Sequence, residues 1–169
     1  MFEKTLLSNL IYNEDFTRKT LPFIKPDFFR NRDEVTLFNI INAFVVKYNN
    51  LPTKEAIEIE LSNNKTLTED EYKNTKSLLN SLQHEEVEQQ WLLDTTEKFC
   101  KDRAVYNAVL QGIKIIDGKD KKHTPEAIPS ILSEALGVSF DRHIGHDYLA
   151  QTDERFDYYH RVEERLKFD

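Results

Sequence analysis

The stretch WLLDTTEKFCKDRAVYNAVLQGIKIID, Trp91 to Asp117, decides the fold. Apolar residues recur in it at intervals of three and four, the spacing that places them on one face of an α-helix. At 1.5 Å per residue, a helix over this stretch is on the order of 40 Å long. Its predicted apolar face consists of Trp91, Leu92, Thr95, Phe99, Tyr106, Val109, Leu110, Ile113 and Ile116.

A second, shorter helix is predicted to return beside the long one. Gly118 is suited to end the long helix, because glycine tolerates the left-handed conformation found at many helix ends. Thr124 and Pro125 then supply a cap and a first helical residue for EAIPSILSEAL. The polar run QHEEVEQQ separates this region from the preceding chain. We therefore expect a helical hairpin over residues 85–138.

The chain before the hairpin, residues 1–84, is predicted to form a small globular helical bundle. Pro22 and Pro26 restrict the segment around them to short turns of helix. The following EVTLFNIINAFVVKY has an apolar stripe wide enough for a central, mostly buried helix. That stripe consists of Leu37, Phe38, Ile41, Phe44, Val45 and Tyr48.

Helix-capping residues define the next two helices of the bundle. Thr53 is placed to cap a short helix, and Thr68 followed by Glu71 three residues later matches a capping box. Helical patterns therefore account for almost the whole chain, and the predicted fold class is all-α.

The C-terminal region, residues 139–169, begins with SFDRHIGHDYLA and continues as one more amphipathic pattern. Gly145 allows a turn, and Asp147 is placed to cap the last helix by accepting its first N–H bonds. The apolar side of that helix carries Leu149, Thr152, Phe156, Tyr159, Val162 and Leu166. The pattern stops at Asp169 without a cap, so we expect an N-terminal fragment of a longer protein.

Composition limits the functions open to the chain. The formal charge is −7 and the pI is near 5.3. Because DNA phosphates are also negative, this charge argues against strong DNA binding. The basic run KDKKH, Lys119 to His123, is best interpreted as a solvated loop, with a weak phosphate contact as the lesser alternative. The single Cys100 excludes an internal disulfide and favours a reducing compartment, the cytoplasm. No apolar run approaches the roughly 18 residues that span a bilayer.

Two histidines and two aspartates in SFDRHIGHDYLA raise the alternative of a metal or acid/base centre. His143, His146 and Asp147, with His160 later, match no metal-binding spacing. A metalloenzyme in a helical bundle needs repeated Glu-x-x-His pairs, and the sequence offers only Asp157-x-x-His160. We therefore interpret the stretch as a joint between helices.

Two further motifs are near-misses. HEEVE, His84 to Glu88, lacks the second histidine of the helical zinc-protease motif and is typical of a polar helix start. GIKIIDGKD, Gly112 to Asp120, has the wrong glycine spacing for a phosphate loop, and Asp120 replaces the Ser or Thr that holds magnesium. The sequence predicts no catalytic, cofactor-binding or metal-binding residue.

The aromatic residues of the long helix favour packing over nucleic-acid stacking. Trp91, Phe99 and Tyr106 on one face of an acidic domain are more typical of core or subunit interface. Phe156, Tyr158 and Tyr159 on the last helix are candidates for a partner surface.

Taken in order, several segments resemble the N-terminal region of DnaB-type hexameric replicative DNA helicases, in the form carried by T-even-like phages. The segments are EYKNTKSLLNSL, WLLDTTEKFCKDRAVYNAV, AIPSILSEALGVSFD and GHD followed by the aromatic-rich helix. The resemblance extends over nearly the whole chain and is strongest from Tyr72 to Tyr148. It depends on the ordered set, since no single motif is diagnostic.

The resemblance implies an all-helical domain whose hairpins pair and assemble into a collar above a ring of motor domains. It implies a homo-oligomer, dimer or hexamer, that contacts primase, a helicase loader and the neighbouring motor domain. The implied oligomer interface is Trp91, Phe99, Tyr106, Leu110, Ile113 and Ile131. The implied docking face of the linker helix is Leu149, Phe156, Tyr159, Val162 and Leu166, and the implied hinge is Gly137, Gly145 and Asp147.

The resemblance implies that this region holds helicase subunits at fixed spacing and has no catalytic role. The ATP-binding residues of the motor have no counterpart in this sequence. ATP and magnesium are expected in the absent RecA-like domain, so this fragment is not expected to be an enzyme. The alternative is a free-standing helical adaptor or helicase loader of phage replication. A loader should have a basic, aromatic-lined surface.

Overall fold

The computed structural model describes residues 2–140 and is all-α in that part of the chain, which confirms the predicted fold class. Three short 3₁₀ turns accompany seven α-helices there. The predicted last helix, with Gly145 and Asp147 before it, lies outside the described residues. The helices are α1 (Phe2–Tyr12), α2 (Glu14–Thr20), α3 (Arg32–Tyr48), α4 (Lys54–Asn63), α5 (Glu69–Ser81), α6 (Gln89–Ile116) and α7 (Ile128–Leu136); the turns are η1 (Leu21–Phe23), η2 (Pro26–Phe28) and η3 (Pro125–Ala127).

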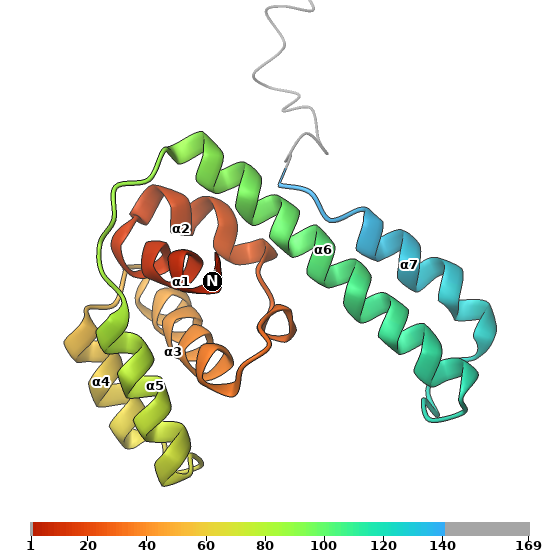
Figure 1. The fold of residues 1–169 in the computed structure, drawn as a ribbon, viewed down its shortest axis with the longest axis horizontal. Coiled ribbons are helices and arrows are strands. Elements are labelled where there is room, and N and C mark those ends of the chain that lie inside the picture. Colours follow the sequence, from red (N-terminus) through yellow and green to blue (C-terminus); the bar gives the residue numbers. More distant parts are fainter. Residues whose placement is uncertain (1, 141–169) are drawn as a thin grey trace, which may run out of the picture.

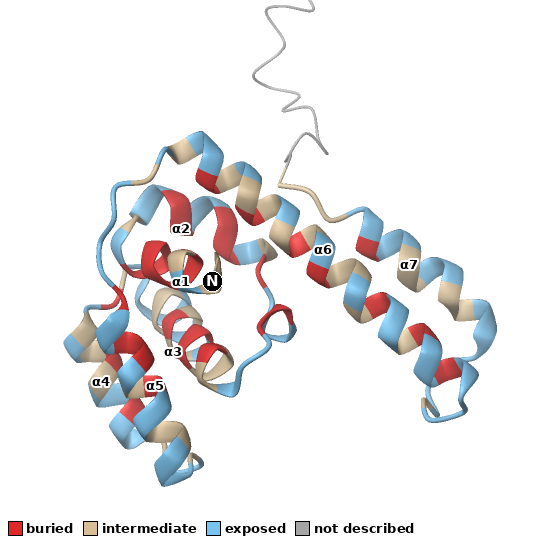
Figure 2. Cartoon of the chain, in the orientation of Figure 1, coloured by how far each residue is buried: buried red, intermediate tan, exposed pale blue. Residues whose placement is uncertain are grey.

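Helices α1 to α5 form a body around one apolar core, and the first half of α6 packs against it (Figure 1). Apolar residues of each helix face inward, as the buried positions in Figure 2 show. Burial of such side chains contributes roughly 1.5–3 kcal/mol each. The largest core side chains with almost no exposure are Leu6, Leu7, Leu10, Phe16, Leu37, Phe38, Ile41, Ile57, Leu79, Leu82 and Leu92.

The predicted caps of the body helices are confirmed. The Thr53 hydroxyl accepts a hydrogen bond from the main-chain N–H of Ala56 at 3.2 Å. The Thr68 hydroxyl accepts from Glu71 N at 3.2 Å, and Glu71 Oε2 accepts from Thr68 N at 3.0 Å, which completes the capping box. Helix α3 ends at Asn49, whose φ of 51° is in the left-handed region that asparagine tolerates.

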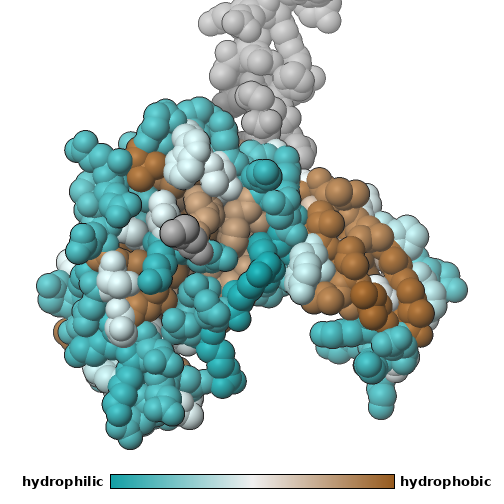
Figure 3. Space-filling view, in the orientation of Figure 1, coloured by the Kyte–Doolittle hydropathy of each residue, from teal (hydrophilic) through white to brown (hydrophobic). Residues whose placement is uncertain are grey.

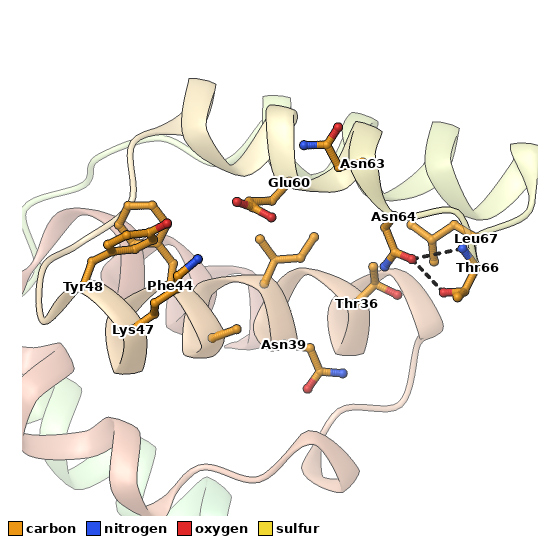
Figure 4. A pocket seen from close by; sticks show the side chains of 12 residues that line it. Thr36, Asn39, Phe44, Lys47, Tyr48, Glu60, Asn63, Asn64, Thr66 and Leu67 are labelled. Atoms are coloured by element: carbon orange, nitrogen blue, oxygen red, sulfur yellow. Dashed lines mark hydrogen bonds between the residues drawn. The ribbon is translucent and has the colours of Figure 1, made fainter.

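The prediction of a central, mostly buried helix is wrong for the C-terminal end of α3. Leu37, Phe38 and Ile41 are in the core, but Phe44 is half-buried and Tyr48 is exposed. Helix α4 lies beside α3 but leaves open space along it, from Thr36 to Tyr48. A groove of about 610 Å³ lies between the two helices, as Figure 4 shows, and its walls mix apolar side chains with amides and hydroxyls.

Helices α6 and α7 form a hairpin that projects from the body. Helix α6 passes α2 and extends beyond the body, and α7 runs back alongside its outer half (Figure 1). The turn between them uses Gly118 at a φ of 69°, which glycine adopts without a Cβ clash. At the helix crossing, a Cβ on Gly112 would lie 3.6 Å from Ile128 Cγ2, so the glycine is in close contact with α7.

Candidate interaction surface of the hairpin

Helix α6 uses different faces along its length. In its first half, Leu92, Thr96 and Cys100 are buried against the body. In its second half, Gly112 is buried where α7 crosses, and Ala108 and Ile115 are also buried. One face of the second half remains exposed.

That face is apolar. We call it the outer stripe, and its exposed side chains are Tyr106, Val109, Leu110, Ile113 and Ile116. Relative exposure within it ranges from 39% at Leu110 to 71% at Ile116. Figure 3 shows hydrophobic surface gathered over the hairpin, whereas most of the body's visible surface is hydrophilic. An exposed apolar face of this kind is typical of surfaces that another molecule covers.

The six residues expected at the oligomer interface do not share one surface. Tyr106, Leu110 and Ile113 lie in the outer stripe, and Ile131 is half-buried on α7. Phe99 is half-buried against the body, with its ring centroid 5.6 Å from that of Phe2. Trp91 lies at the start of α6, where its ring is edge-on to the same Phe2 at 6.5 Å. The body therefore covers Phe99 in the first half of the stripe that periodicity predicts as one face, whereas Trp91 remains 51% exposed.

Polar contacts that periodicity does not predict hold α6 to the body at the start of the outer stripe. Arg103 Nε donates to the main-chain oxygen of Phe28 at 2.6 Å, and Asn107 Nδ2 donates to that of Asp27 at 2.9 Å. The Arg103 guanidinium also lies 5.0 Å from the centroid of the Tyr106 ring. The sequence carries no local signal for these two contacts, because both acceptors are main-chain oxygens of a distant segment.

The expected hinge begins at Gly137, which ends α7 with its N–H bonded to the main-chain oxygens of Ser133 and Glu134. The chain then returns to the body, where the Phe140 ring centroid lies 4.9 Å from that of Phe23. The other hinge and linker positions lie outside the described residues. They are Gly145, Asp147, Leu149, Phe156, Tyr159, Val162 and Leu166.

No cluster of three or more His, Cys, Asp or Glu side chains that could hold a metal ion occurs among residues 2–140. His143, His146 and His160 lie outside that range. Burial raises the pKa of the Cys100 thiol to about 12, so this cysteine is a poor nucleophile.

The HEEVE segment, residues 84–88, precedes α6 directly. Glu88 caps that helix by accepting a hydrogen bond from Gln90 N at 3.0 Å, as predicted for a polar helix start. No helix in the described part of the chain has the length and hydropathy needed to cross a membrane.

No family model matches the chain. The sequence is similar to the DnaB-like replicative helicase of Enterobacteria phage T4, with 31% identity over 159 residues. The match covers 89% of this chain and 33% of that protein, so the chain spans about a third of the length of the curated relative. The resemblance indicated by the ordered sequence segments is therefore confirmed: over most of its length the chain is similar to a DnaB-like replicative helicase.

Proposed function

We propose that this chain is the N-terminal collar and oligomerisation domain of a phage replicative DNA helicase. The observation that carries the proposal is the outer stripe of α6, an apolar face left exposed beside the face that packs on α7. Covering apolar surface is favourable by roughly 25 cal/mol per Å², so a partner that buries these side chains is favoured.

A second copy of the chain is the partner that fits this stripe best. Most soluble homo-oligomers have closed symmetry, and in their commonest form the same patch on each copy meets its equivalent. A helical face rich in Leu, Ile and Tyr can pair with itself, and apolar faces are typical of permanent interfaces. The hairpin would then pair with another hairpin, and such pairs would build a dimer or hexamer.

We propose a helicase activity for the longer parent protein, and none for this chain by itself. The parent would unwind duplex DNA in the host-cell cytoplasm, with ATP and magnesium bound by a RecA-like motor domain. The collar would hold the subunits together and offer surfaces to primase and the loader. Residues 147–166 would form the linker helix that docks on a neighbouring motor domain, with Gly137, Gly145 and Asp147 as the hinge.

Native mass by light scattering over a concentration series tests the proposal, using this chain and a version that ends after Phe140. A dimer or hexamer in both cases supports assembly through the hairpin. A mass that falls on truncation assigns assembly to residues 141–169. A monomer in both at high concentration contradicts the proposal and favours the adaptor interpretation.

A further inference from the structure

The turn at the end of the hairpin gathers positive charge. Lys114 lies in the last turn of α6, and Lys119, Lys121 and Lys122 lie in the loop that follows. All four are exposed residues, and we call them the tip lysines. Figure 3 shows hydrophilic surface at this end of the hairpin, next to the apolar surface.

The backbone of this loop is held in one conformation by its own hydrogen bonds. The N–H groups of Lys119 and Asp120 both donate to the main-chain oxygen of Lys114, at 2.9 and 3.1 Å. Gly118 supplies the left-handed residue at the turn. A fixed backbone presents the lysine stems at set positions, which lowers the entropy cost of binding.

The acidic side chain at the centre of the loop points inward. Asp120 Oδ1 accepts hydrogen bonds from Lys122 N at 2.8 Å and His123 N at 3.3 Å, and Oδ2 lies 3.0 Å from His123 Nδ1. Its side chain is only 16% exposed. The carboxylate is therefore engaged within the loop, and the lysines form the outer surface.

The overall negative charge of the chain does not cancel the positive charge at the tip. The acidic residue within α6 that lies nearest to Lys114 is Asp102, roughly 18 Å away along the helix at 1.5 Å per residue. Exposed charges are screened over about 8 to 10 Å at physiological ionic strength. Within the loop, the second acid is Asp117, which pairs with Lys119 at 3.3 Å. Lysines outnumber acids along residues 114–126, even when Glu126 in the following turn is included.

We propose that the tip lysines are a contact point for the phosphate backbone of a nucleic acid. Lysine binds phosphate as a point charge, without the planar geometry that arginine uses. The loop from Asp117 to His123 contains no Phe, Tyr or Trp on which a base could stack, so the contact is independent of base sequence. With so few charges it is weak for one copy, and several copies in one assembly strengthen it by multivalency.

The test is fluorescence anisotropy of a labelled oligothymidylate of about 20 nucleotides, titrated with the full chain at several salt concentrations. The variant is Lys121→Glu/Lys122→Glu, which leaves Lys114 and Lys119 in place. The matched control is Lys65→Glu/Lys73→Glu, which alters two exposed lysines of the body by the same charge.

Fold and oligomeric state are measured on the same samples. Thermal unfolding checks that each variant folds, and light scattering gives its native mass. Lys121→Gln/Lys122→Gln repeats the test with a smaller change of charge, which separates a lost contact from added repulsion. This variant should also bind more weakly than the unmodified chain, and full affinity in it overturns the proposal.

The Lys121→Glu/Lys122→Glu variant is expected to bind at least about tenfold more weakly at low salt. The slope of log affinity against log salt should fall by about 1.4, because each lost contact to a single strand contributes about 0.7. The control should stay within about twofold of the unmodified chain. Equal weakening in variant and control, or no binding by the unmodified chain at low salt, overturns the proposal. Unchanged DNA affinity with altered native mass overturns it in favour of a contact between the tip lysines and a second copy of this chain.

Discussion

Arg103 on α6 donates from Nε to the main-chain oxygen of Phe28 at 2.6 Å, and this bond ties the hairpin to the body. Asn107, one turn further along α6, makes a similar bond to Asp27. Arg103 Nη1 is buried and has no hydrogen-bond partner among residues 2–140. The Arg103 side chain therefore ties α6 to the body at the point where the hairpin begins to project, and its Nη1 is an unsatisfied donor.

Substitution of Arg103 should separate these two effects. Arg103→Ala removes both the bond and the packing of the stem, and is expected to lower the free energy of unfolding by about 2–3 kcal/mol. Arg103→Met keeps most of the stem and removes a buried charge, so its cost should be below about 1.5 kcal/mol. Urea unfolding measures both. Equal costs for the two variants would show that the stem contributes nothing beyond the charge and its bond.

Gly112 should tolerate one methyl group and no more. A Cβ there would meet Ile128 Cγ2 at 3.6 Å, an ordinary contact distance. Gly112→Ala is therefore expected to stabilise the chain by up to about 1 kcal/mol, because alanine has the higher helix propensity. Gly112→Leu should cost about 1–3 kcal/mol, since its larger side chain displaces α7. Thermal unfolding distinguishes the two signs, and a destabilising alanine would contradict the observed spacing between α6 and α7.

At Gly118, substitution by alanine should destabilise the protein, the opposite of the effect expected at Gly112. The Gly118 φ of 69° is unfavourable for residues with a Cβ, although open space surrounds it. Gly118→Ala is expected to destabilise the hairpin by about 1–2 kcal/mol through backbone strain alone. Gly118→Asn should cost less, because asparagine tolerates this conformation. A neutral alanine variant in urea unfolding would mean that the turn relaxes to another conformation.

The tip loop should lose order in acid. Hydrogen bonds to Asp120, the one from Lys122 N foremost, lower its pKa from 3.8 to about 2. A lowered folded pKa means that the ionised carboxylate stabilises the loop above pH 3.8, and that this contribution is lost as the pH falls through about 2. NMR titration of the Asp120 carboxyl should give a midpoint near 2, and Asp120→Asn should abolish the acid-dependent change in the Lys122 amide shift. A midpoint at 3.8 would refute the inward-facing geometry.

Local rules predict the helices well because their signals lie within a few residues. Thr68 and Glu71 make the capping box expected from their spacing, and Gly118 adopts the expected left-handed turn. Periodicity does not predict which part of a helix face is buried when a distant segment of the chain packs on only part of that face. Phe99 and Tyr106 share a predicted stripe, yet Phe99 packs on Phe2 from the N-terminus of the chain whereas Tyr106 is exposed. The period of a helix shows which residues align, and only the tertiary fold decides what covers each of them.

The same limit explains the Arg103 contact. Its acceptor is a main-chain oxygen 75 residues earlier in the chain, and no side-chain pattern encodes that partner. The groove beside α3 has a similar origin, because the burial of Phe44 and Tyr48 depends on how a separate helix, α4, packs beside them.

Pairing of copies through the outer stripe is tested most directly by native mass. Light scattering over a concentration series compares Leu110→Asp/Ile113→Asp with the unmodified chain. The matched control is Val46→Asp/Ile59→Asp, which changes two exposed apolar residues of the body, 76% and 61% exposed. Pairing through the stripe predicts a dimer or larger assembly for the unmodified chain and the control, and a folded monomer for the hairpin variant. An assembly that persists in the hairpin variant, or dissociates equally in the control, would contradict it.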